Sequence, residues 1–183
     1  DIDAIRRGHS TVPQLYLSNL PTELAISKDS KVRKKVFILS VLPLILKVNE
    51  DIITDRTKLS EIVFSMEYSG EASEVDQQWL HSKMKQYQIE RFDIPELYSR
   101  MNIIPPSLAL TQSAIETGWG SSRFAQQGNA LFGQWTWNSQ EGLVPRGREE
   151  GKTHLIKKFD SLIDAVYGYA MNLNTHPAYA DFR

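Results

Sequence analysis

The sequence predicts a mainly α-helical protein with one small β-hairpin late in the chain, and three observations support this fold class. Apolar residues recur at helical spacing in several segments, each bounded by residues that begin or end helices. From Leu131 the pattern changes to closely spaced aromatic residues and glycines, which is typical of a hairpin or a loop. A chain of 183 residues, of which 41% are hydrophobic and 23% charged, can bury a core without disulfides or metal ions.

The N-terminal third is expected to hold an extended arm followed by a helix. Pro13 and Pro21 and the lack of periodicity indicate local turns over the first thirty residues. A helix should follow over about 31–47, with Asp29 or Ser30 as its cap. We expect a kink or break near Pro43, because proline lacks the N–H that an interior helical position donates.

The most apolar stretch of the chain, residues 36–48, is a candidate membrane segment. It is shorter than the roughly 20 residues needed to cross a bilayer, and it contains a proline. We therefore expect a buried helix and no stable membrane insertion of this part of the protein.

The rest of the chain alternates helical patterns with short connections. Helices are expected, in order, over about 56–66, 74–88, 94–101, 107–117 and 161–174, with a short turn over 122–127. Leu143-Val144 and His154-Leu155-Ile156 bracket a polar stretch with two glycines, and this bracket predicts the hairpin or a mobile loop.

Several function classes are excluded or made improbable by composition. The net charge of −1 provides no basic field for nucleic acid. Without cysteine, thiolate metal sites and Cys-His hydrolases are excluded. No phosphate-binding loop or serine nucleophile elbow is present. Four widely spaced histidines form no metal-ligand pattern, so we expect neither a metal nor another cofactor: His9, His81, His154 and His176.

Glu116 is the main candidate for catalytic chemistry. It lies in the last turn of the predicted helix over 107–117, where the partial negative charge of the carbonyl end disfavours a carboxylate. Apolar neighbours, including Trp119, should favour the protonated carboxyl further. A glutamate that stays protonated near neutral pH can act as the general acid in glycosidic cleavage, although the same residue could also be an ordinary surface glutamate on a helix end.

Three ordered motifs resemble those of the glucosaminidase family of bacterial cell-wall hydrolases, glycoside hydrolase family 73. They are Glu-Thr-Gly-Trp-Gly at 116–120, Asn-Ala-Leu-Phe-Gly at 129–133 and His-Pro-Ala-Tyr at 176–179. The second motif departs from the family pattern, since Leu131 is inserted. The run from Leu131 to Trp137 and the helical N-terminal part are most similar to the Bax-type members of the family.

The resemblance implies a lysozyme-like fold, in which an α lobe and a small β-hairpin lobe flank a cleft. Residues 93–183 would form the catalytic core, and residues 1–92 an N-terminal arm and helical extension packed on it. The implied function is an endo-β-N-acetylglucosaminidase that cleaves the β-1,4 bond between N-acetylglucosamine and N-acetylmuramic acid in peptidoglycan, with Glu116 as general acid. The partner would be a peptidoglycan glycan strand, and the location would be the periplasm or cell envelope.

The resemblance also implies a second carboxylate on the hairpin that activates water. Among Glu141, Glu149 and Glu150 we favour Glu149 or Glu150, which stand beside Gly151 where the hairpin should turn. Both could instead be solvated charges beside neighbouring arginines. The acetamido group of the substrate would then act as the nucleophile.

Further residues are expected to line the sugar-binding groove, because sugar rings pack their C–H faces on aromatic planes. Tyr179 is the strongest candidate for substrate contact, Trp135 and Trp137 are expected to have mixed roles, and Trp119 and Phe132 should be mostly structural. The predicted substrate-binding set is Trp119, Asn129, Phe132, Gly133, Trp135, Trp137 and Tyr179.

Other functions stay open at this point. A lytic transglycosylase would use the same acid, need no second carboxylate and leave an anhydro product. A non-catalytic cell-wall-binding domain would keep the cleft without turnover, although the intact Glu116 argues against it. The N-terminal helices could also bind a partner protein, but no residue pattern specifically supports this.

Overall fold

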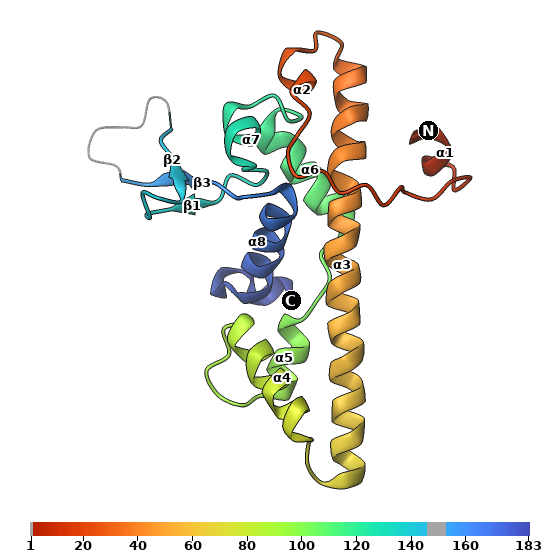
Figure 1. Ribbon diagram of the computed structural model, residues 1–183, viewed down its shortest axis with the longest axis vertical. Helices are drawn as coiled ribbons and strands as arrows, with labels where there is room; N and C mark the ends of the chain where they lie inside the picture. Colours follow the sequence, from red (N-terminus) through yellow and green to blue (C-terminus); the bar gives the residue numbers. More distant parts are fainter. Residues whose placement is uncertain (1, 146–152) are drawn as a thin grey trace. The chain divides into compact units, whose positions relative to one another are not determined.

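The protein is built mainly from helices, with one small antiparallel sheet (Figure 1). The structure is a computed structural model that describes residues 2–145 and 153–183. The predicted mainly α fold with a small β element, as in lysozyme-like proteins, is confirmed. The elements are α1 (Ile2–Arg6), α2 (Glu23–Ile26), α3 (Ser30–Ser69), α4 (Glu74–Gln86), α5 (Ile94–Arg100), α6 (Pro106–Thr117), α7 (Arg123–Gly128), β1 (Trp135–Thr136), β2 (Gly142–Leu143), β3 (Leu155–Lys157), α8 (Leu162–Thr175) and the 3₁₀ helix η1 (Pro177–Phe182).

The chain forms two compact units. Unit 1 contains residues 1–48 and 105–169, and unit 2 contains residues 49–104 and 170–183. Both units therefore draw residues from each side of the boundary expected between residues 92 and 93, and that division of the chain stays a prediction.

The predicted interruption near Pro43 is wrong, because α3 is a single helix of 40 residues with Pro43 inside it. Proline deprives only the carbonyl of Leu39 of its helical partner, at a cost of about 3 kcal/mol. Around it Phe37, Val41 and Leu44 are fully buried. Each such side chain stabilises the folded state by about 1.5–3 kcal/mol, so packing outweighs the missing hydrogen bond.

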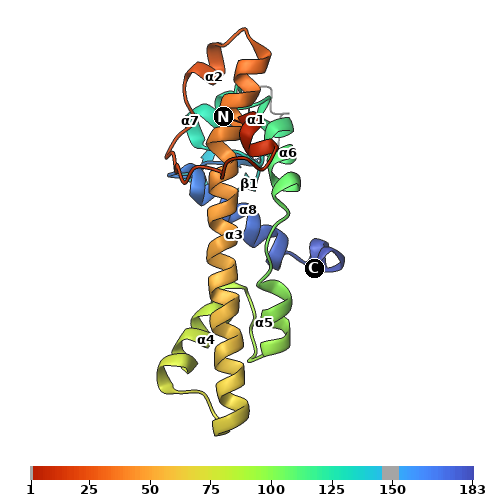
Figure 2. The ribbon, with the colours of Figure 1, turned by 90° about the vertical axis from the view of Figure 1, so that its right-hand side faces the viewer.

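The core of unit 1 lies where α2, α3 and the turn after α6 approach one another. Figures 1 and 2 show α2 folded back beside the first turns of α3. Gly120 lies so close to these helices that an added Cβ would be 2.9 Å from side-chain carbons of both Leu24 and Phe37. The glycine thus permits this turn to pack directly on α2 and α3.

The small sheet of unit 1 has three strands in the order β1-β3-β2, all antiparallel. Ile156 of β3 pairs with Trp135 on one side and with Leu143 on the other. The expected pairing of the segments at 143 and 155 is confirmed, and β1 adds a strand that the hairpin prediction did not include.

Unit 2 is held together by side chains that satisfy backbone groups across long sequence separations. The side chain of Asn49 is buried; its Nδ2 donates to the carbonyl of Ile104 at 2.7 Å, and its Oδ1 accepts from the Ile104 N–H at 2.9 Å. The Arg56 guanidinium donates to the carbonyls of Tyr98 and Met101 near the end of α5.

Within the described residues, no helix is both long enough and apolar enough to span a membrane.

Candidate active site

Glu116 lies in the last turn of α6, and its side chain is exposed. Gly118 ends the helix in the left-handed region at φ 57°, as its position in the motif predicts. The Thr117 hydroxyl donates to the Ser113 carbonyl at 2.6 Å and accepts from the Gly120 N–H at 2.8 Å. These bonds fix the turn that follows Glu116 and hold the helix end rigid beneath the carboxylate.

The carboxylate of Glu116 lies against Gly133, so residues from the first two motifs meet. Gly133 has φ +62°, and a Cβ added to it would lie 2.9 Å from Oε2 of Glu116 and 3.5 Å from its Cδ. Glycine is required at this position for two reasons. It can adopt this backbone conformation, and it leaves the space that the Glu116 carboxylate occupies.

The segment that carries Gly133 is fixed to α8 by its neighbours on both sides. The ring of Phe132 stacks on Tyr169 with 4.0 Å between centroids and 5° between planes, and both side chains are buried. The Gln134 amide donates to the carbonyl of Gly168 at 3.2 Å. The described contacts of Phe132 are packing contacts that hold the segment carrying Gly133 against α8, and its binding of substrate stays a prediction.

Trp119 packs back onto α3. Its ring meets Phe37 edge-on at 5.9 Å, and the Lys34 ammonium lies 5.1 Å from the ring centroid. Its φ of 60° is in the left-handed region, which the tight turn after Gly118 imposes. These contacts join the turn after α6 to α3, and the role of Trp119 at the site stays a prediction.

Asn129 is buried, although we expected it to bind substrate. It ends α7 at φ 50°, and its Nδ2 donates to Oδ1 of Asn19 and to the carbonyls of Phe159 and Asp160. The described contacts of Asn129 thus hold the start of the second motif against the N-terminal arm and the segment before α8. Its binding of substrate stays a prediction.

Two indole rings of the sheet region are exposed. Trp135 in β1 is 59% exposed, and Trp137, which follows the strand, is 71% exposed. Trp135 stacks on His154 with 4.5 Å between ring centroids, so β1 and the start of β3 hold its plane in place. Exposed, oriented rings of this kind suit the C–H faces of sugars.

The remaining predicted residues are not brought to Glu116 by any described contact. Glu149 and Glu150 lie outside the described residues. Glu141 is exposed and accepts from the Asn138 amide at 2.9 Å within a local turn. Tyr179 lies in η1 of unit 2, where its ring is 6.0 Å from that of His176. The roles of Tyr179, Glu149 and Glu150 at the site stay predictions.

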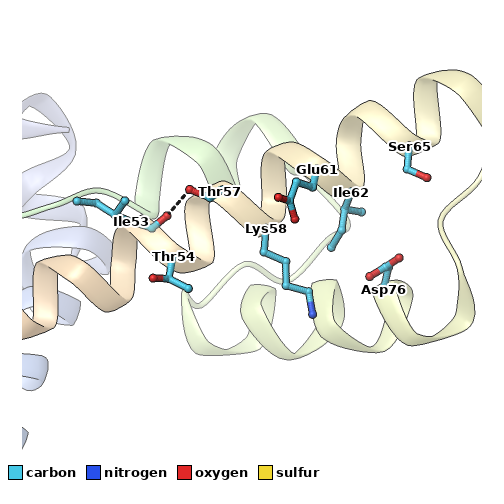
Figure 3. Close-up of a pocket in the computed structure, with 8 residues that line it drawn as sticks. All are labelled: Ile53, Thr54, Thr57, Lys58, Glu61, Ile62, Ser65 and Asp76. Carbon is cyan, nitrogen blue, oxygen red and sulfur yellow. Dashed lines mark hydrogen bonds between the residues drawn. The ribbon is translucent and has the colours of Figure 1, made fainter.

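One well-formed concavity lies elsewhere, on unit 2, and contains none of the predicted site residues (Figure 3). It is an open groove of about 510 Å³ whose lining mixes hydroxyl, charged and aliphatic side chains of α3 and α4: Ile53, Thr54, Thr57, Lys58, Glu61, Ile62, Ser65 and Asp76. Among the described residues, no group of three or more His, Cys, Asp or Glu side chains could hold a metal ion.

Two residues of the site were not singled out from the sequence as site residues: Gln112 and Tyr169. The Tyr169 hydroxyl is 2.8 Å from Oε1 of Gln112. Gln112 stands four residues before Glu116, a spacing that places both on one face of α6 and could have identified it. No sequence pattern could have identified Tyr169, because it lies on the apolar face of α8, where a core residue is expected.

A mainly helical fold with a small sheet, and an exposed glutamate beside a motif glycine, agree with the glycosidase class that the motifs predict. Residues 93–183 match the Glucosaminidase family, described as mannosyl-glycoprotein endo-beta-N-acetylglucosaminidase, and this part of the chain belongs to that family. Membership indicates glycosidase chemistry on a glycan.

A similar protein is Protein bax of Escherichia coli (strain K12). It is 34% identical over 172 residues, which cover 91% of this chain and 59% of that protein. The chain therefore spans about three fifths of the length of this relative. No solved structure gives a significant match.

Proposed function

We propose that the protein is an endo-β-N-acetylglucosaminidase that hydrolyses the β-1,4 bond between N-acetylglucosamine and N-acetylmuramic acid in peptidoglycan. Glu116 is the general acid and protonates the leaving glycosidic oxygen. The observation that carries this proposal is the exposed Glu116 carboxylate at a rigid helix end, seated against Gly133 of the second family motif. Action on peptidoglycan would place the enzyme in the periplasm or cell envelope.

Cleavage also requires a nucleophile, which attacks the anomeric carbon as Glu116 protonates the leaving oxygen. Glu149 or Glu150 would activate a water molecule, and if neither does, the acetamido group of the substrate supplies the nucleophile. Separate Glu149→Gln and Glu150→Gln variants distinguish these routes. A strong loss in one variant identifies the base, and full activity in both favours substrate assistance.

The glycan would lie over the exposed indole rings in β1 and directly after it. Trp135, held by its stack on His154, and the more exposed Trp137 present apolar planes to the sugar faces, and Tyr179 would contact a further sugar. The proposal requires no metal, so chelation with EDTA should leave the rate unchanged.

The test of the acid is Glu116→Gln, which keeps the shape of the side chain and removes its proton. We expect the release of reducing ends from purified peptidoglycan to fall by at least about 100-fold, the lower range for loss of general acid catalysis. Glu23→Gln is the matched control, since Glu23 is another exposed glutamate of unit 1 at the start of α2. Parental activity in Glu116→Gln would show that another group is the acid.

A further inference from the structure

The hydrogen bond between Tyr169 and Gln112 joins two side chains of unit 1 that lie 57 positions apart in the sequence. Tyr169 is 3% exposed, and its ring is already fixed by the stack on Phe132. Its hydroxyl lies 2.8 Å from Oε1 of Gln112, so the phenol O–H donates to the amide carbonyl. A rigid donor therefore sets the orientation of the Gln112 amide.

This orientation leaves the NH₂ of Gln112 available. Among the described residues, Nε2 of Gln112 has no hydrogen-bond partner, and it is not one of the buried polar atoms that lack one. Gln112 is half-buried, so its Nε2 keeps access to solvent. An amide group has two N–H donors, and both are open to an external acceptor.

The location of this donor is set by α6. Gln112 precedes Glu116 by four residues, and residues with this spacing are neighbours on one helix face, about 5–6 Å apart at Cβ. Glu116 in turn contacts Gly133, which follows the Phe132 ring that supports Tyr169. Gln112, Tyr169, Phe132, Gly133 and Glu116 thus form one connected set around the proposed acid.

We propose that Gln112 is a substrate-binding residue whose amide NH₂ donates to an oxygen of the glycan beside the scissile bond. Tyr169 is its positioning residue and acts through Gln112. This inference rests on the proposed function, since it requires that a glycan lies over Glu116. The chemistry of the acceptor is that of a sugar hydroxyl or an N-acetyl carbonyl, both of which abound on an N-acetylglucosamine strand.

The test measures binding separately from turnover. In the Glu116→Gln background, calorimetry gives the Kd for a peptide-free tetrasaccharide of alternating N-acetylglucosamine and N-acetylmuramic acid. Gln112→Met keeps the length of the side chain and removes both polar groups, and we expect it to raise Kd by about threefold to tenfold, the effect of one lost neutral hydrogen bond. Gln127→Met is the control, because Gln127 is an exposed glutamine of α7 in the same unit.

Tyr169→Phe separates the positioning role from packing, since it keeps the ring and its stack on Phe132 and removes only the hydroxyl. We expect a smaller rise in Kd than for Gln112→Met, and a Gln112→Met/Tyr169→Phe double variant that binds like Gln112→Met alone. In the active enzyme the same variants should raise KM more than they lower kcat. A purely structural role would lower the unfolding temperature and leave Kd of the folded protein unchanged.

Two outcomes overturn the inference alone. They are an unchanged Kd for Gln112→Met, and additive effects of the two substitutions, in either case with a parent enzyme that cleaves peptidoglycan. A parent that does not cleave, together with a Glu116→Gln variant that does not bind the tetrasaccharide, overturns the proposed function and this inference together.

Discussion

The contact between Gly133 and Glu116 gives the most specific prediction about the site. In Gly133→Ala the new Cβ would lie 2.9 Å from Oε2 of Glu116, whereas ordinary contact begins near 3.4 Å, so the carboxylate must move by about 0.5 Å. A misplacement of 1 Å can cost a reaction about 100-fold, and half of that shift suggests a loss of about tenfold. Because Glu116 is exposed, its carboxylate can turn into solvent without unfolding the protein.

The same substitution also carries a backbone cost, which needs its own control. Alanine at φ +62° costs about 1–2 kcal/mol of stability. Gly70→Ala imposes the same kind of strain at φ +86°, and nothing lies within 4 Å of its added Cβ. We therefore expect similar losses of unfolding free energy in both variants, measured by urea denaturation, and lower activity only in Gly133→Ala.

The assay is the initial rate of reducing-end release from peptidoglycan, corrected for the folded fraction. Parental activity in Gly133→Ala would refute the reasoning, because a carboxylate displaced from its seat could not then be the acid. Equal activity losses in Gly133→Ala and Gly70→Ala would also refute it, since the effect would come from backbone strain and not from the contact.

Three further predictions concern stability and glycan contact. Burial, and secondly the charge of Asp55, raises the pKa of Tyr87 from 10.0 to about 12. The unfolded chain loses this proton first, so stability should fall by up to about 3 kcal/mol between pH 10 and 12, and Tyr87→Phe should lack that loss in urea titrations at each pH. Asn49→Ala leaves the N–H and C=O of Ile104 buried without their partner and should destabilise the protein by about 2–4 kcal/mol; a loss below 0.5 kcal/mol would contradict this. Trp137→Ala should change stability by less than about 0.5 kcal/mol, because the ring is 71% exposed, but should reduce co-sedimentation with peptidoglycan; unchanged co-sedimentation would remove Trp137 from the glycan surface.

Local signals in the sequence predicted most of the helices and one helix end in detail. Gly118 ends α6 as expected, and Asp29 accepts from the N–H groups of Lys31 and Val32 at the start of α3. The interruption at Pro43 could not be judged locally, because its cost is offset by side chains that α3 buries against distant parts of the chain. The strand β1 was not predicted because its two residues, Trp135 and Thr136, are too few to show an alternating pattern.

The site was predictable where it depends on motifs and not where it depends on packing. The motifs identified Glu116 and Gly133 separately, and the structure shows why they belong together. The bond between Tyr169 and Gln112 joins residues 57 positions apart, a pairing that no local pattern specifies. Asn129 belongs to a motif, yet its described hydrogen bonds go to other residues of the protein, so a motif position alone does not separate a ligand contact from a structural one.

The central claim is tested most directly by digesting purified peptidoglycan, reducing the products with borohydride and analysing them by mass spectrometry. The proposed reaction predicts fragments with reduced N-acetylglucosamine at their ends, present with the parent protein and with Glu23→Gln and absent with Glu116→Gln. Fragments that end in anhydro-N-acetylmuramic acid would identify a lytic transglycosylase that uses the same acid. No released fragments would contradict the claim of catalysis and favour a cell-wall-binding domain.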